Sequence, residues 1–343
     1  MVGGGVTGLA TALACRRAGL GDVLVIEGER LAGGPSGRAA GTLTPGIHAL
    51  VRPGPFVSLA RRGLELHREL DADWEHAAGF RTIDSLVVVP TALPAELVEP
   101  AGGRVVDGPT AHEIEPELGE IDYAIHLPDQ GSIRPLAVAA QLASRAGSVA
   151  TRTRMLGIET ASGRVVRVRT SRGDVSPGTL VLATGTADEI PLPQMRIKGH
   201  MLATEPAPFR LRTLPAGVIG LVQTADRRIV AGGTFDNGDD TPDVREAVIN
   251  GMVAEVNRLV PRAAELAVSH RWTCFRPAVP DELPVIDRVP GLENAWASLG
   301  HFRTGIMVAP AGAELIAAWI RDGEQPEEAT PFSADRFAEI AAR

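Results

Sequence analysis

Three glycines at the start of the chain have the spacing best suited to holding a phosphate. Gly3, Gly5 and Gly8 follow the pattern G-x-G-x-x-G, with Val6 and Thr7 between the last two. Glycines in this pattern let the backbone approach a pyrophosphate, and the helix that follows adds N–H donors and a partial positive charge. The spacing therefore predicts a dinucleotide-binding loop.

The elements around this loop agree with the prediction. Apolar residues at helical spacing predict a helix over 6–18, and an apolar run predicts a buried parallel strand over 23–26. The strand ends at Glu27, which follows Gly8 by 19 residues. An acid about 20 residues beyond the glycines holds a ribose hydroxyl in dinucleotide sites. A purely structural turn is the alternative.

The strand that should precede the loop is short. A strand is typically about five residues long, but only Met1 and Val2 come before Gly3. We therefore expect that the true start codon lies upstream or that the chain is shortened.

A second glycine-rich segment follows Glu27 and is expected to form another wall around the cofactor phosphates. Ser36 and Arg38 are its candidate donors, with an ordinary exposed arginine as the alternative for Arg38. Further on, a buried strand over 179–183 runs into a turn at Gly185, where a small residue lets the backbone pass close to a ligand. The cofactor-binding candidates of the second segment are Gly34, Ser36, Arg38, Ala39, Ala40 and Gly41.

Composition narrows the class of protein. The chain has 343 residues, a net charge of −8 and two cysteines. The charge argues against a nucleic-acid surface, which needs clustered Lys and Arg. No apolar run reaches the length of a membrane span, no secretion signal is evident, and no metal-ligand spacing is recognisable. A cytoplasmic enzyme without a metal is the default expectation.

Two other segments have a clear pattern but no predicted chemistry. A long helix is expected over 56–78, with His67 and His76 at its surface. Residues 164–169 partly alternate arginine with valine, which predicts a half-exposed antiparallel strand with a solvated charged face.

The C-terminal part carries the most specific motifs. Cys274, Arg276 and Pro277 precede a PDELPVI segment, and a strand over 295–299 leads into the loop 300–305. With these motifs the chain resembles the D-amino acid oxidase (DAO) family of FAD enzymes, most closely the glycine oxidase branch. The matching segments are GGGVTGL, GGPSGRAAGTLTP, DQGSIRP, LVLATG, RPAVPDELPVI and GHFRTGIMVAPAGAELIA.

The resemblance implies an α/β fold, α+β overall. It would consist of a Rossmann-like FAD-binding domain of the two-dinucleotide-binding type and an inserted mixed-sheet substrate domain. We expect the FAD-binding domain to comprise 1–80, 128–195 and 276–343. The substrate domain would comprise 81–127 and 196–275.

The resemblance also implies a reaction. A hydride would pass from the Cα–H of a small amino acid or N-alkyl glycine to flavin N5, leaving an imine that hydrolyses to an oxo acid. Oxygen or another acceptor would then take the electrons. The expected partners are thus small molecules, and a homo-oligomer is left open.

Arginine is the residue type expected to hold the substrate. Family members with the RP motif bind the substrate carboxylate through the arginine that matches Arg276, and a planar guanidinium suits a carboxylate. Arg303 is expected beside the flavin or the substrate, and His301 is expected to support the loop rather than transfer protons. The candidates for cofactor contact in this loop are Gly300, Phe302, Arg303, Thr304 and Gly305.

Cys274 departs from the glycine oxidase pattern, which usually has glycine there. In the sarcosine oxidase branch a cysteine seven residues before the Asp of the PD motif carries the flavin covalently, and Cys274 and Asp281 have that spacing. Covalent FAD through Cys274 is therefore a hypothesis. Its alternative is a small buried thiol.

Two expected polar residues are missing. Glycine oxidases place a tyrosine where this chain has Leu221 or Gly220, and Tyr123 is the one tyrosine present. The oxygen-activating lysine of sarcosine oxidases has Val230 near its place. The pocket should be less polar than in those relatives, which favours a bulkier or N-substituted substrate and leaves oxidase versus dehydrogenase open.

Two other functions compete with amine oxidation. One is an NAD(P)H-dependent flavin monooxygenase or reductase, which the C-terminal motifs disfavour. The other is a catalytically degenerate flavoprotein subunit, which the missing tyrosine favours and Arg276 disfavours.

Overall fold

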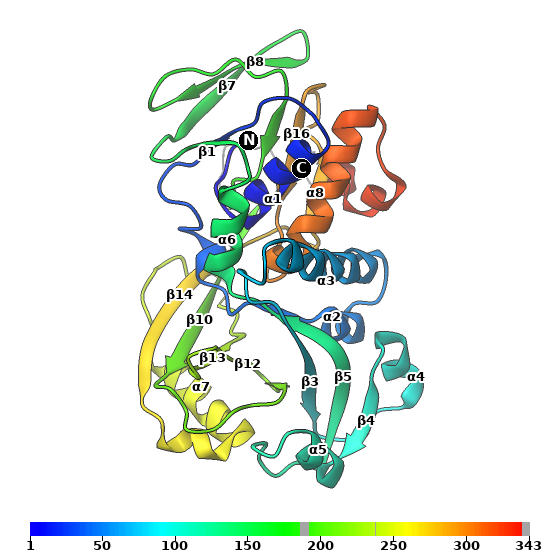
Figure 1. The fold of residues 1–343 in the computed structure, drawn as a ribbon, viewed down its shortest axis with the longest axis vertical. Helices are drawn as coiled ribbons and strands as arrows, with labels where there is room; N and C mark the ends of the chain where they lie inside the picture. The colour runs from blue at the N-terminus through cyan, green and yellow to red at the C-terminus, as the bar shows by residue number, and fades with distance from the viewer. Residues whose placement is uncertain (186–191, 237, 338–343) are drawn as a thin grey trace.

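A computed structural model describes residues 1–185, 192–236 and 238–337. The chain forms two lobes, with α1, α8, β1 and β16 in the upper one and a large curled sheet in the lower one (Figure 1). The helices are α1 Val6–Arg17, α2 Pro45–Val51, α3 Pro55–Asp73, α4 Ala95–Val98, α5 Gly108–Ile114, α6 Pro135–Ala143, α7 Glu246–Leu259 and α8 Gly305–Asp322.

The strands divide between the two lobes. Those of the upper lobe are β1 Leu24–Ile26, β6 Ser148–Ala150, β7 Met155–Ala161, β8 Arg164–Thr170, β9 Leu180–Leu182, β15 Val285–Arg288 and β16 Ala295–Leu299. Those of the lower sheet are β2 Thr42–Leu43, β3 Arg81–Val89, β4 Arg104–Asp107, β5 Tyr123–Ser132, β10 Met195–Thr204, β11 Leu214–Ala216, β12 Gly220–Gln223, β13 Ile229–Gly232 and β14 Val268–Ala278.

The upper lobe contains a mostly parallel sheet. β6 pairs with β1, and β9 pairs with β16, both in parallel, while β15 is antiparallel to β16. Val2 joins the two pairs through parallel bridges to Ile26 and Leu182. Because strands of such a sheet are covered on both faces, the central strands β1 and β9 consist of apolar residues only. The predicted strands over 23–26, 179–183 and 295–299 are all present.

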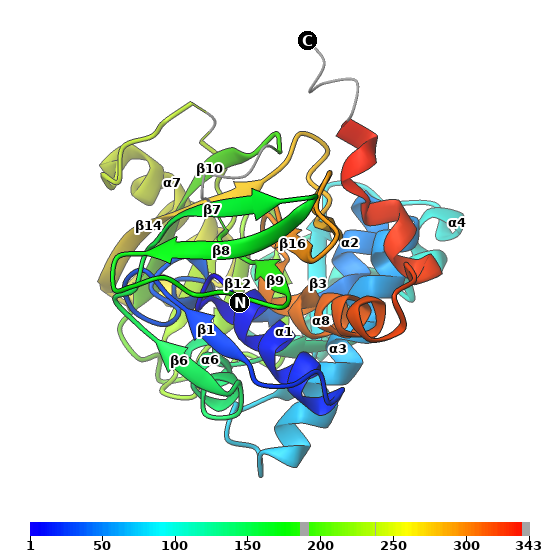
Figure 2. The ribbon, with the colours of Figure 1, turned by 90° about the horizontal axis from the view of Figure 1, so that it is seen from above.

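Helices α1, α3 and α8 enclose the core of this lobe (Figures 1 and 2). The predicted helix over 56–78 is too long, because α3 ends at Asp73. The Asp71 carboxylate accepts hydrogen bonds from the N–H groups of Ala78 (2.9 Å) and Phe80 (3.1 Å). Those bonds hold the chain in a turn in which Glu75 and His76 have positive φ.

The β7–β8 hairpin lies at the top of the upper lobe, as Figures 1 and 2 show. The expected strand over 164–169 is confirmed as β8, which pairs antiparallel with β7. Arg167 on β8 lies 3.6 Å from both Glu159 and Asp174, and all three side chains are about half exposed. These charges form a solvated surface.

The lower lobe is a nine-stranded sheet in the order β14-β10-β13-β12-β11-β3-β5-β2, with β4 also paired to β5. Apolar residues of α7, including Met252 and Leu259, pack on Leu202 and Leu221 of the sheet. Strands β5 and β14 run across the expected domain boundaries at 127/128 and 275/276. The boundaries themselves stay a prediction.

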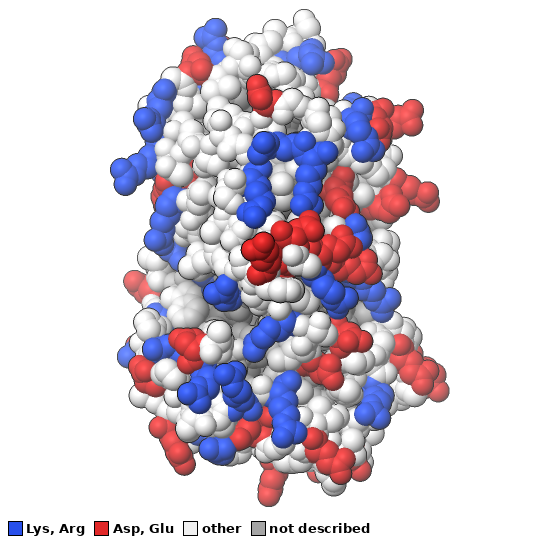
Figure 3. All heavy atoms as spheres, viewed as in Figure 1, with Lys and Arg blue, Asp and Glu red and all other residues white. Residues whose placement is uncertain are grey.

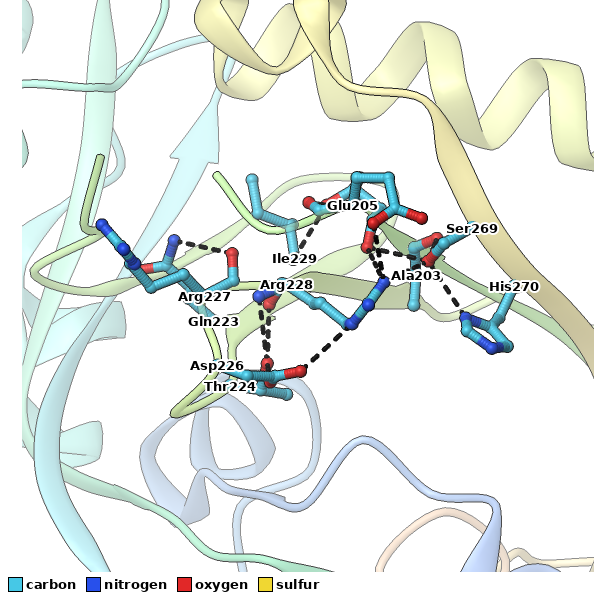
Figure 4. Close-up of polar contacts among 11 residues, drawn as sticks. Ala203, Glu205, Gln223, Thr224, Asp226, Arg227, Arg228, Ile229, Ser269 and His270 are labelled. Carbon is cyan, nitrogen blue, oxygen red and sulfur yellow. Dashed lines mark hydrogen bonds and ion pairs between the residues drawn. The ribbon is translucent and has the colours of Figure 1, made fainter. Parts of the chain in front are cut away.

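One polar cluster ties the far end of the lower sheet together (Figure 4). Arg228 donates to Ser269 Oγ (2.8 Å) and Asp226 Oδ2 (3.1 Å), which connects the β12–β13 turn to β14. None of the labelled residues lines the cleft described below, so this cluster is structural.

Charges of both signs are interspersed over the face shown in Figure 3. Within 1–185, 192–236 and 238–337, no helix has the length and apolar character needed to cross a bilayer.

Candidate functional site

A cleft of about 1040 Å³ runs between the upper-lobe loops and the lower sheet. It brings together 18 of the predicted site residues, from both ends of the chain. These are Gly3, Gly5, Thr7, Glu27, Gly34, Ser36, Arg38, Ala39, Ala40, Gly41, Gly185, Cys274, Arg276, His301, Phe302, Arg303, Thr304 and Gly305. The other three, Val6, Gly8 and Gly300, do not line it but shape the loops that do.

At two positions of the glycine loop, no residue larger than glycine fits. Gly3 has φ +114°, and a Cβ there would lie 2.2 Å from Ala183 O. A Cβ on Gly8 would lie 2.0 Å from Gly3 O. Both contacts are with backbone atoms, which cannot move aside as a side chain would. The loop therefore packs tightly under the start of α1, as a pyrophosphate site requires.

Side chains complete this end of the cleft. Ser36 Oγ accepts the Val6 N–H at 3.0 Å, and its own hydroxyl hydrogen remains available to a ligand. The Glu27 carboxylate accepts the N–H groups of Gly4 (2.7 Å) and Glu29 (2.8 Å). It is thereby fixed at the edge of the cleft, where it could accept a ribose hydroxyl. These residues fit an FAD.

Arg276 reaches across the sheet at the other end of the cleft. It lies on β14 opposite Ile197 of β10, and its guanidinium extends over the neighbouring Gly199. A Cβ on Gly199 would lie 2.3 Å from Arg276 Nη1. Beyond Gly199, that nitrogen donates to Thr234 O at 2.8 Å. Because Gly199 has no side chain, the Arg276 guanidinium can cross β10 at that position.

One aromatic ring lies beside this guanidinium, and a second ring packs against the first. The Phe235 ring centroid lies 5.1 Å from Arg276 Cζ and 5.6 Å from the Phe302 ring. Burial lowers the pKa of Arg276, and the nearby Arg303 lowers it further. The side chain stays cationic because guanidinium is protonated at any physiological pH.

The loop 300–305 has a strained backbone held by hydrogen bonds. Gly300 and Phe302 have φ of +64° and +48°, and Phe302 N donates to Pro277 O at 2.6 Å. Buried His301 places Nε2 3.0 Å from Ser298 Oγ, and burial lowers its pKa to about 4. This arrangement suits the loop-supporting role expected for His301.

The expectation that His67 lies at the surface is wrong. His67 is buried, and its Nε2 lies 2.7 Å from Ile306 O at the start of α8. The α3 face that carries it packs on α8, so the imidazole fills an interior position. Burial lowers its pKa to about 4.

Two buried histidines predict an acid-sensitive fold. The pKa values of His67 and His301 are lowered from 6.5 to about 4, so the unfolded chain binds more protons between those limits. These histidines therefore do not lower the free energy of unfolding above pH 6.5. Toward pH 4 each of them lowers it by roughly 1.4 kcal/mol per pH unit. Urea unfolding at pH 7.5, 6.5 and 5.5 should show this slope. The pKa of His48 is lowered to about 4 as well, so H67Q should lose about a third of the combined slope, and an unchanged slope in that variant would contradict the assignment.

Cys274 lies on β14 opposite Gly199 and lines the cleft. Burial raises the pKa of its thiol, while the positive charges of Arg38 and Arg276 oppose that rise. Its Sγ lies 3.7 Å from its neighbour's carbonyl, Phe275 O. The position allows contact with a bound cofactor.

The structure separates the two candidates for the missing tyrosine. Gly220 lines the cleft, whereas Leu221 is buried under α7. A Cβ on Gly220 would meet no atom within 4 Å, so the cleft is open there. Val230 does not line the cleft.

Sequence reasoning missed several residues here. Phe235 and Thr234 follow β13, and His48 lines the cleft from α2 with its pKa lowered to about 4 by burial and by Arg303. Lys198, the one lysine in the chain, is buried with Nζ 2.8 Å from Asp239 Oδ2. Lys198 neighbours Gly199 on β10, so it points to the opposite face of the sheet. No local pattern marks any of them.

A mostly parallel sheet with a glycine loop, joined to a large mixed sheet across a cleft, is typical of a dinucleotide-binding protein. The chain matches the family model of the DAO family, FAD dependent oxidoreductase, over residues 1–319. It belongs to this family. The predicted family, enzyme class, fold class and FAD cofactor are thereby confirmed.

Individual relatives agree with the family. The bifunctional protein ThiO/ThiG of Synechocystis sp. is 28% identical over 98% of this chain and 53% of its own length, so this chain spans about half of that protein. The glycine oxidase of Pseudomonas aeruginosa is 28% identical over 97% of both chains. The L-proline dehydrogenase of P. horikoshii shares the fold, with a TM-score of 0.90, 19% identity and coverage of 99% and 97%.

Proposed function

We propose that this chain oxidises the C–N bond of a small amino acid or N-alkyl glycine. The observation that carries the proposal is the Arg276 guanidinium. It is held over Gly199 by Thr234 O, in the same cleft as the glycine loop. A carboxylate is the ligand that a fixed, half-buried guanidinium favours. The relative named glycine oxidase supports a substrate of this kind.

Residues at the two ends of the cleft have different proposed roles, and the substrate end is described first. A bound FAD would supply the hydride acceptor for the substrate Cα–H, and the resulting substrate imine would be hydrolysed by water to an oxo acid. Arg276 holds the substrate carboxylate, with the Phe235 ring beside its guanidinium. Arg303 and His301 line the same end, with His301 holding the loop in place.

The opposite end would hold the cofactor. The glycine loop and the start of α1 would bind the pyrophosphate, with Glu27 on the ribose and Ser36 and Arg38 as further donors. The remaining predicted contacts, from Gly34 to Gly41, at Gly185 and in the loop 300–305, belong to the same proposal. The discontinuous domain division, a cytoplasmic location and a homo-oligomer remain predictions.

Anaerobic reduction of the bound flavin tests the proposal. Purified yellow protein is mixed with glycine, sarcosine, proline, and D- and L-alanine, and the absorbance near 450 nm is followed. At least one amine should bleach it, and oxygen or an artificial acceptor should restore the colour, which separates oxidase from dehydrogenase. Bleaching by NAD(P)H alone would point to a monooxygenase or reductase. No bleaching at all would favour a degenerate subunit.

Covalent attachment through Cys274 is a separate proposal. Acid precipitation of the wild type should leave the yellow colour in the pellet, because a covalent bond survives denaturation. The C274S variant should release its FAD into the supernatant. Full release from the wild type would refute attachment.

A further inference from the structure

Two guanidinium groups share the substrate end of the cleft. Arg276 Cζ lies 5.1 Å and Arg303 Cζ lies 5.6 Å from the centroid of the same Phe235 ring. Both arginines line the cleft, and Arg303 is exposed to it. Among the described residues, neither forms an ion pair with a carboxylate. Arg276 and Arg303 are thus two cations at the substrate end that have no ion-paired carboxylate in the part of the chain that the structure describes.

The neighbouring carboxylates are already engaged by other groups. The charge of Asp236 acts on Arg276, but the Asp236 carboxylate is paired with Arg245. The carboxylates that line the cleft, Glu27 and Glu29, lie at its ribose end. Glu282, the acid whose charge acts on Arg303, is already bound by Arg52 at 3.1 Å. Two like charges in a partly desolvated site repel each other, and that cost is offset when anions bind.

One α-carboxylate satisfies one guanidinium, since the planar fork binds a carboxylate through two parallel N–H···O bonds. The second guanidinium then needs a second anion. The cleft that both arginines line also has open space in front of Gly220. The surrounding side chains Val218 and Ile219 are apolar and cannot supply a charge.

We propose that the substrate carries a second acid group and that Arg303 binds it. The substrate class is then an amino dicarboxylate or an N-carboxyalkyl amino acid, oxidised at the same C–N bond. This inference rests on the proposed amine oxidation and refines its substrate.

Matched substrate pairs test the inference. Sarcosine is compared with iminodiacetate, and alanine with aspartate, in the wild type and in R303M, with R321M as the control. Arg321 is exposed on α8 and paired with Asp322, outside the cleft. The wild type should show kcat/KM at least about tenfold higher for one dicarboxylate than for its partner. That ratio should fall to about one in R303M and stay unchanged in R321M.

A binding measurement gives a second readout that needs no turnover. Titration calorimetry with succinate and with butyrate should show the dicarboxylate bound about tenfold more tightly by the wild type and not by R303M. Oxidation of monocarboxylate amines with equal ratios in wild type and R303M would overturn the inference and leave the proposed function standing. A uniform loss for both members of each pair, with a shifted flavin potential, would place Arg303 at the cofactor and also overturn it. Failure of every amine to reduce the flavin would instead refute the proposed function.

Discussion

Replacing Arg276 with methionine should lower kcat/KM for the amine substrate by about a thousandfold. Truncating one partner of a desolvated charge pair costs about 2–5 kcal/mol, because the other charge is left without a counter-charge. The loss should fall mainly on KM if Arg276 only binds the carboxylate. Steady-state kinetics on protein with full FAD content, read from its absorbance, would measure it. The R321M variant is the control.

A second variant displaces the side chain of the same arginine without replacing the arginine itself. In G199A the new methyl group would lie 2.3 Å from Arg276 Nη1, so the guanidinium must leave its place over β10 and its bond to Thr234 O. The displaced atoms belong to a flexible side-chain end, so the fold should survive. A misplacement of about 1 Å can cost about a hundredfold in rate. Wild-type kinetics in G199A would contradict the position assigned to Arg276.

The matched control for G199A is G178A. Gly178 is exposed, and a Cβ on it would meet nothing within 4 Å. Its kinetics and FAD content should equal those of the wild type. Activity lost in both variants would indicate a general effect of glycine replacement, and the link between Gly199 and Arg276 would then fail.

The cofactor end of the cleft could be predicted because its signals are local. The glycine loop, the helix after it and the acid at Glu27 follow one another within 27 residues, and each has a spacing set by the ligand. The strands of the upper sheet could be predicted for a similar reason. They are buried on both faces and read as short continuous apolar runs.

The substrate end could be predicted only in part. Sequence motifs indicated Arg276 and Arg303. The crossing of the Arg276 side chain over Gly199, however, depends on the register between β10 and β14, which no local pattern reveals. Phe235 lies in a loop that is held in place by β10, because the N–H of Asp236 donates to Lys198 O of that strand at 2.9 Å. His67 illustrates the same limit, since its burial depends on how α3 packs against α8.

Gly8→Ala should yield a protein that does not retain FAD. The added Cβ would lie 2.0 Å from the backbone oxygen of Gly3, so the loop and the start of α1 must separate. The pyrophosphate site would then lose both its shape and the aligned N–H groups. The ratio of flavin to protein absorbance after purification, and after incubation with excess FAD, measures the loss. A G8A protein that binds FAD like the wild type would contradict the placement of the cofactor.

Two further variants separate loss of FAD from loss of the fold. Gly251→Ala changes a glycine inside α7 whose Cβ would meet no atom within 4 Å, so it should keep FAD and gain about 1 kcal/mol of stability from helix propensity. Ser36→Ala removes both the acceptor of the Val6 N–H and a candidate donor to the cofactor, and should weaken FAD binding by about tenfold while the protein stays folded. If G8A does not fold at all, S36A still tests the site. Unchanged FAD affinity in S36A would show that this wall of the cleft does not contribute to cofactor binding.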